Sequence, residues 1–492
     1  MKTTVSAALA IIAATLAVVG VVLRANEPAA VQPGRNGPVN AAGLIEAHNS
    51  PSLARDPRRP GSVVITDRVD RPGFSAGLSW STNDGRTWSH TALPLPHGLD
   101  RPYAPDVAFA PDGTLYVTYV NLSGTGNVPA NLWLSKSSDG GRTLSAPVRI
   151  AGKLTFQARL AVDRAGIVHV TWLQADEVGL LSFAGPPAPI VAASSADRGR
   201  TFSRPVRVSD PRRALVGAAS PVIDSEGRLV VLYEDFKDDR RDFENLDGPP
   251  WDRPFSLVVT RPVGSRAFAA GVELERNVVP THRFLAFLPE FPSLAAGAGN
   301  TLYAAWSDGR NGDEDVFLRR SRDGGATWSA AQRINDNPLH DKTSQYLPRV
   351  AVAPDGRVDV LYLDRRRDPR NVMTDATLAS SADGTSFRNV RLSTRSFDSR
   401  IGASSAPRLP IDFGSRLALA SDDERSLAAW TDTRLGSSAT GRQDVFAADY
   451  TTRSASLLTR APVIAILAGL AAALAAGSLI RRSRLRRERV SP

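Results

Sequence analysis

The octapeptide SRDGGATW occupies residues 321–328, and close copies of it recur along the chain at regular distances. The copies are STNDGRTW at 81–88, SSDGGRTL at 137–144 and SADRGRTF at 195–202, and a shortened form, SADGTSF, occupies 381–387. They begin 56, 58, 126 and 60 residues apart, and 126 is twice 63, so one copy is missing near residue 258. A regular period of this size indicates one supersecondary unit repeated in tandem.

A second repeated motif is a stretch of β-forming residues that ends in aromatic or acidic side chains. It occurs seven times, at 62–68, 114–120, 167–173, 228–235, 301–308, 357–364 and 426–432. With the glycine turns around it, each module is typical of four short antiparallel strands. The sequence therefore predicts an all-β fold, a β-propeller whose radial closure protects the sheet edges.

The number of modules favours seven blades, with six as the alternative. The last module, 411–450, lacks a fourth strand of its own, and the N-terminal segment PVNAAGLIEAH at 38–48 is expected to supply it and close the ring.

Composition excludes several classes of function. The 492 residues include no cysteine, which excludes disulfides and thiolate chemistry, and the six histidines show no metal-ligand spacing, so neither metal nor cofactor is expected. The formal net charge is +10, but the last twelve residues hold six arginines and one glutamate and so contribute +5 of it. The rest is scattered, and a nucleic-acid partner is not expected.

Two uncharged apolar segments define the expected topology. Residues 4–23 form a signal peptide or a retained signal anchor, and residues 461–480 are long enough for a transmembrane helix. The arginine-rich tail at 481–492 is expected to stay in the cytoplasm. The predicted order is a signal segment (1–25), a linker with a possible ring-closing strand (26–48), the propeller (49–450), a linker (451–460), the helix and the tail. The propeller is then extracytoplasmic, on a single-pass or double-pass membrane protein.

The octapeptide resembles the Asp box, or bacterial neuraminidase repeat, of the sialidase superfamily, and the resemblance covers about residues 50–450. It implies a turn between the third and fourth strands of each blade, a structural role rather than a catalytic one. An Asp at the third position accepts backbone hydrogen bonds within its own turn, and Asn does the same at the first copy. The structural box residues are therefore Asn83, Asp139, Asp197, Asp323 and Asp383.

The face opposite these turns is expected to carry recognition. Aligning the modules on their glycine turns gives one equivalent position where each first strand begins: Ser52, Asp106, Arg159, Ser220, Ser293, Arg349 and, across an uncertain gap, Arg416. We expect Arg159, Arg349 and Arg416 to converge as an anion-binding triad, because the guanidinium fork suits a carboxylate. The alternative is that each arginine pairs with a carboxylate of a neighbouring blade.

Catalytic candidates follow from the family resemblance. It implies a tyrosine nucleophile paired with a glutamate, and an aspartate as acid/base. Tyr103, Tyr346, Glu290 and Asp106 are the candidates on the expected face, although the family's Arg-Ile-Pro motif is replaced by ARDPRRP at 54–60. Two functions are therefore open: a module that binds a glycan, an anionic polymer or a protein partner, or an exo-glycosidase of the sialidase type.

Overall fold

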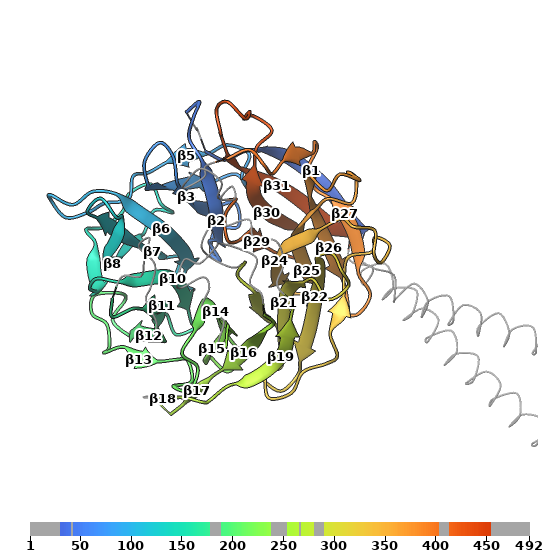
Figure 1. Ribbon diagram of the computed structural model, residues 1–492. Coiled ribbons are helices and arrows are strands. Elements are labelled where there is room, and N and C mark those ends of the chain that lie inside the picture. Colours follow the sequence, from blue (N-terminus) through green and yellow to red (C-terminus); the bar gives the residue numbers. More distant parts are fainter. Residues whose placement is uncertain are drawn as a thin grey trace, which may run out of the picture.

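The computed structural model describes residues 30–40, 43–177, 188–237, 253–264, 267–279, 290–402 and 413–453. Seven antiparallel sheets, each built on four principal strands, stand around one central axis as a β-propeller (Figure 1). The predicted all-β propeller with seven blades is confirmed, and the six-blade alternative is wrong.

The strands follow the predicted modules, with the first strand of each blade innermost. Blade 1 contains β2 (His48–Arg55), β3 (Val63–Val69), β4 (Ser75–Ser81) and β5 (Ser89–His90); blade 2 contains β6 (Pro102–Phe109), β7 (Leu115–Ser123), β8 (Val128–Ser137) and β9 (Val148–Ala151); blade 3 contains β10 (Thr155–Val162), β11 (Val168–Gln174), β12 (Ile190–Ser195) and β13 (Val206–Arg207).

Blade 4 contains β14 (Val216–Ile223), β15 (Leu229–Asp235), β16 (Phe255–Thr260) and β19 (Val272–Val278); blade 5 contains β20 (Ser293–Ala296), β21 (Leu302–Asp308), β22 (Asp315–Ser321) and β23 (Gln332–Arg333); blade 6 contains β24 (Gln345–Val352), β25 (Val358–Asp364), β26 (Met373–Ser381) and β27 (Arg388–Arg391), with β28 (Phe397–Asp398) paired to β26. Blade 7 contains β29 (Ala418–Ala420), β30 (Arg425–Asp432), β31 (Asp444–Arg453) and β1 (Ala30–Pro38).

The hydrophobic core lies between blades rather than at the centre of the ring. Seven buried clusters fill the seven seams between neighbouring blades, including the seam between blade 7 and blade 1. A buried aromatic side chain occupies the same position of the second strand in six blades: Tyr119, Trp172, Tyr233, Trp306, Tyr362 and Trp430. Large aromatic rings contribute most of the buried apolar area here, which explains why the second-strand motif repeats.

The ring closes through β1, which pairs with β31 as the outermost strand of blade 7. Ala30 lies opposite Arg453 and Pro38 lies opposite Phe446, so the closing strand precedes the segment 38–48 expected from the sequence. Its sequence, AVQPGRNGP, contains two prolines and two glycines and has little strand propensity. An edge strand tolerates proline because one side of it needs no ladder bonds.

The octapeptide forms the turn between the third and fourth strands of five blades. In blade 5, Asp323 accepts hydrogen bonds from the backbone N–H of Thr327 (2.9 Å), from the Thr327 hydroxyl (2.5 Å) and from the Ser321 hydroxyl (2.7 Å). Gly325 has a φ of +91°, a conformation that glycine adopts without strain, and donates its N–H to Ser321 Oγ (2.8 Å).

The other copies make similar bonds within their own turns. Asn83 accepts the N–H of Thr87 at 3.0 Å, as Asp323 does for Thr327. Blade 4 has no octapeptide, and the hairpin of β17 (Pro262–Val263) and β18 (Ala267–Phe268) stands between its third and fourth strands.

The apolar segments 4–23 and 461–480 lie outside the described residues. Within the part of the chain that the structure describes, there is no helix with the length and hydropathy needed to cross a membrane.

Replacing Asp323 tests the structural role of the octapeptide. Asp323→Ala removes three hydrogen bonds and is expected to lower the free energy of unfolding by about 1–2 kcal/mol, a modest loss because the turn is exposed. Asp323→Asn is expected to lose less, since Asn83 already serves the same turn in blade 1. Chemical denaturation measures both; equal losses for Ala and Asn would contradict this role.

Candidate functional site

The aligned positions of the inner strands are structurally equivalent because a β-bulge precedes them. The register shifts directly before five of them, Ser52, Asp106, Arg159, Ser220 and Arg349. Two residues earlier in each strand, a residue other than glycine has a positive φ: Ser50, Ala104, Gln157, Ala218 and Leu347. A bulge re-aims the side chains that follow it, so the bulges determine which residues face the neighbouring blade and the axis.

Several of the aligned side chains link neighbouring blades. Ser220 Oγ accepts the N–H of Leu294 (3.1 Å), and Ser293 Oγ accepts the N–H of Val350 (3.0 Å). Asp106 occupies the same position in blade 2. These bonds form a series of clips around the inside of the ring.

Asp106 makes this clip and also faces the predicted arginines. Its Oδ2 accepts the N–H of Leu160 at 2.8 Å and lies 3.5 Å from Arg159 Nε, and Ser52 donates to Oδ1. Although burial favours the neutral acid, the charges of Arg159 and Arg416 and these hydrogen bonds hold the pKa of Asp106 below its usual range. An ionised, buried carboxylate is not suited to donate a proton, as the predicted acid/base role requires.

The three predicted arginines surround Asp106. Arg416 lies two residues before β29 and donates through Nη2 to the carbonyl of Pro105 (2.8 Å). The backbone of Arg349 pairs with Leu361 across β24 and β25, but its side chain makes no hydrogen bond or ion pair with another described residue. The Nε atoms of Arg159, Arg349 and Arg416, and Nη1 of Arg159, are buried without a hydrogen-bond partner in the described part of the chain.

The charges in this cluster are not balanced. Three guanidinium groups face one carboxylate, an excess of two positive charges among these four side chains. Burial and the neighbouring charge of Arg159 lower the pKa of Arg349 to about 10 and that of Arg416 well below its usual value. Buried like charges disfavour one another, so the cluster has unmet capacity for an anion. We call Arg159, Arg349 and Arg416 the arginine cluster.

The two candidate tyrosines lie in different surroundings. Tyr346 is fully buried in the core between blades 6 and 7, and its hydroxyl lies 3.2 Å from Thr374 Oγ1. Burial raises the pKa of Tyr346, so neither access nor acidity suits the predicted nucleophile. Tyr103 is half-buried and donates to Asp70, which also forms an ion pair with Arg68 (2.8 Å).

Glu290 belongs to a group of three acidic residues that sequence reasoning found only in part. Glu234 at the end of β15 and Glu314 directly before β22 are 3% and 2% exposed, and Glu290 is half-buried. Burial and the charge of Glu290 raise the pKa of Glu234 well above its usual value. Burial and Glu314 raise the pKa of Glu290 to about 8. We call these three residues the glutamate cluster.

The sequence signal for Glu234 was its place in YED at 233–235, because no other second strand has an acidic residue at the equivalent position. Glu314 stands among polar loop residues and gave no such signal. Across the described ranges, no three His, Asp or Glu side chains are grouped so that they could hold a metal ion.

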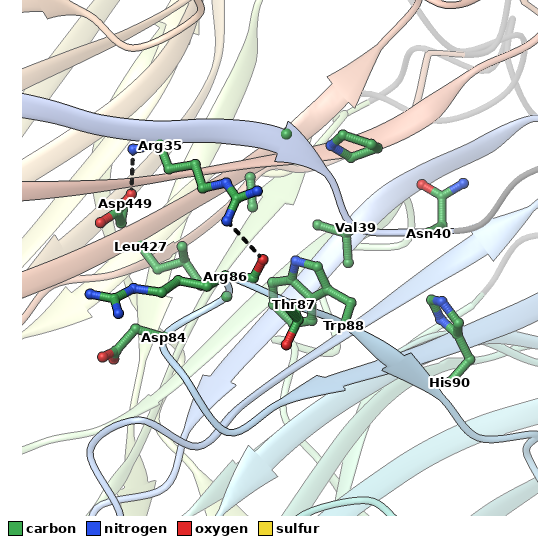
Figure 2. A pocket seen from close by; sticks show the side chains of 14 residues that line it. Arg35, Val39, Asn40, Asp84, Arg86, Thr87, Trp88, His90, Leu427 and Asp449 are labelled. Atoms are coloured by element: carbon green, nitrogen blue, oxygen red, sulfur yellow. Dashed lines mark hydrogen bonds between the residues drawn. The ribbon is translucent and has the colours of Figure 1, made fainter.

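A separate pocket of about 330 Å³ lies at the seam between blade 7 and blade 1. Figure 2 shows that the closing strand β1 and the first octapeptide turn line it, with Arg35, Arg86 and Trp88 among the side chains. Arg35 donates to the Arg86 carbonyl (3.2 Å), and the Arg35 N–H donates to Asp449 Oδ1 (2.6 Å). These bonds fasten the closing strand, and the pocket lies on the octapeptide side, away from the arginine cluster.

Comparison with known proteins adds structural neighbours but no family. No protein-family model and no curated protein matches the chain. A Dyadobacter fermentans protein of unknown function aligns with 14% identity and a TM-score of 0.47, covering 86% of this chain and 99% of that one. An ulvan lyase aligns with 11% identity and a TM-score of 0.45, covering 82% and 94%. The Hadza microbial sialidase Hz136 aligns with 20% identity and a TM-score of 0.43, covering 65% and 64%.

The pKa of Glu290 predicts a pH-dependent stability. The unfolded chain loses this proton near the ordinary value of 4.5, whereas the folded protein keeps it up to about pH 8. The folded state therefore binds the extra proton between these values, and Glu290 makes the protein less stable as pH rises through this window, by up to about 1 kcal/mol per pH unit.

Glu290→Gln removes this titration while keeping an acceptor for the same hydrogen bonds. We expect the stability of the variant relative to the native protein to increase from pH 5 to pH 8 and to be constant above about pH 9. Urea denaturation at a series of pH values measures the difference; a difference independent of pH would contradict the burial of an acid form.

Proposed function

We propose that the propeller binds a glycan through a carboxylate-bearing sugar, which the arginine cluster holds at the end of the channel opposite the octapeptide turns. The observation that supports this is the excess of guanidinium charge around Asp106. A carboxylate accepts two parallel N–H bonds from one guanidinium and would supply the missing charge. Arg349 and Arg416 are half-buried, so part of each side chain remains open to a ligand.

The repeated octapeptide and the propeller fold support a place for this protein among sialidase-like propellers. Hydrolysis by a sialidase-type tyrosine is the less favoured function, because Tyr346 is enclosed by core residues and Asp106 is ionised. Binding of an acidic sugar needs neither group as a catalyst, and it uses the arginines that the structure brings together.

We also propose that the protein is anchored in the cell membrane with the propeller outside the cytoplasm. The β1–β31 pairing places Ala30 opposite Arg453, so the chain enters and leaves the propeller at the same edge of blade 7. The apolar segment 4–23 precedes Ala30 in the sequence, and the apolar segment 461–480 follows Arg453.

Replacing Arg349 tests the anion site. Arg349→Met removes a buried like charge, so we expect it to weaken binding of N-acetylneuraminic acid or glucuronic acid by about 2–3 kcal/mol and to raise the stability of the ligand-free protein by about 1–2 kcal/mol. Calorimetric titration and denaturation measure the two effects.

Arg322→Met is the matched control, since Arg322 is exposed in the octapeptide turn of blade 5, and it should change neither property. Unchanged affinity in Arg349→Met, or binding of the uncharged parent sugar as tightly as the acid, would contradict the proposal.

Protease added outside intact cells tests the topology. It is expected to digest an epitope placed in an exposed turn of the propeller and to spare a tag fused after Pro492. Digestion of the C-terminal tag in intact cells would contradict a cytoplasmic tail.

A further inference from the structure

The glutamate cluster touches the same inner strand that carries Arg349. Glu290 Oε2 accepts the N–H of Leu347 (2.7 Å) and a hydrogen bond from the Ser307 hydroxyl (2.7 Å). Leu347 is two residues before Arg349 on β24, a chain distance of about 7 Å. The glutamate and arginine clusters are therefore joined by one short stretch of strand.

The bond to Leu347 holds a strained part of that strand. Leu347 has a φ of +54°, an uncommon conformation for a side chain of this size, and sits in the bulge that aims Arg349. The equivalent residue of blade 4, Ala218, has a φ of +53°, and its N–H is held by Gln157 Oε1 at 2.7 Å. The backbone N–H of the bulge residue is therefore bound by a neutral amide in blade 4 and by an ionisable carboxyl group in blade 6.

The surroundings of Glu290 are unusual because the described residues around it supply no cation. Among the described residues, neither Glu234 nor Glu290 forms an ion pair, and Glu234 Oε2 and Glu290 Oε1 are buried without a hydrogen-bond partner. In the described part of the chain, the titratable groups that interact with Glu290 are Glu234 of β15 and Glu314 before β22. Tyr346 on β24 in turn faces Glu314 and Arg365.

We propose that the glutamate cluster is a proton-controlled regulator of the arginine cluster, so that an acidic sugar binds when Glu290 is protonated and is released when it ionises. The inference rests on the proposed function and names how that site is regulated. The direction follows from charge. Ionisation places a negative charge on the Glu290 carboxyl group, which contacts β24 two residues before Arg349, and a negative charge there opposes an anion held by Arg349.

The transition is expected near pH 8, where Glu290 loses its proton. By linkage, protonation strengthens anion binding by the same factor by which the bound anion favours protonation. A coupling of ordinary size changes the affinity about 5–150-fold. The sugar carboxylate is ionised throughout this range and does not contribute to the transition.

The experiment compares the full-length protein with Glu290→Gln in calorimetric titrations with the acidic sugar found to bind in the Arg349 test, from pH 6.5 to pH 9. Gln157 shows that a glutamine side chain can hold this type of bulge, so the variant is expected to fold. Glu424→Gln, in the exposed turn between β29 and β30, is the matched control.

We expect the native protein and Glu424→Gln to lose at least about fivefold in affinity across pH 8, and Glu290→Gln to keep nearly constant affinity. A parallel decline in all three proteins would overturn the inference, because the titrating group would then lie elsewhere, for example at Arg349. Constant affinity in the native protein would also overturn it. Absence of binding at every pH would instead overturn the proposed function, and the inference with it.

Discussion

Closure of the ring is the constraint on which the rest of the structure depends. A blade buries its apolar faces only against two neighbours, and the seventh seam exists because β1 completes blade 7 and brings it against blade 1. Once seven equivalent seams must be filled, the inner strands are fixed in number and inclination about one axis. Side chains from blades far apart in sequence then meet, as Asp106 and Arg416 do although 310 residues separate them.

The bulges determine which side chains of this regular scaffold face the axis. Without them, the inner strands would simply alternate their side chains between two neighbouring blades. Where the aligned residue is serine, its hydroxyl accepts a backbone hydrogen bond from the neighbouring blade, and no charge is buried. Where it is arginine, the same position brings like charges together in a poorly solvated place. The arginine cluster is therefore destabilising for the empty protein, a common feature of binding sites.

Much of this arrangement could be predicted from the sequence, and the failures have identifiable physical reasons. The period of SRDGGATW and the buried aromatic residues of the second strands predicted blade number and strand order, because both depend on local patterns. The closing strand 30–38 escaped because an edge strand needs little propensity and can contain proline. Strand spacing predicted that the three arginines lie close together. The equivalent position in blade 7, which pairs with β30, nevertheless lies two residues further along the chain than Arg416.

The acidic residues were harder to predict, because their properties come from burial rather than from sequence. Tyr346 lies at the start of the inner strand β24, directly before its bulge, and its side chain is buried in the core between blades 6 and 7. The family resemblance makes Glu290 a candidate partner of a nucleophile, whereas the structure shows a half-buried acid that accepts the backbone N–H of Leu347. Glu234 and Glu314 become buried and come close to Glu290 only when the blades around them are assembled.

The most direct test of this account is the position of an anion in the assembled propeller. A crystal of the protein soaked in bromide, with diffraction collected at the bromine absorption edge, shows bound anions as anomalous peaks. The account predicts a strong peak among Arg159, Arg349 and Arg416, beside Asp106, and its loss in Arg349→Met. Bromide bound only at exposed arginines, with no density inside the arginine cluster, would contradict it.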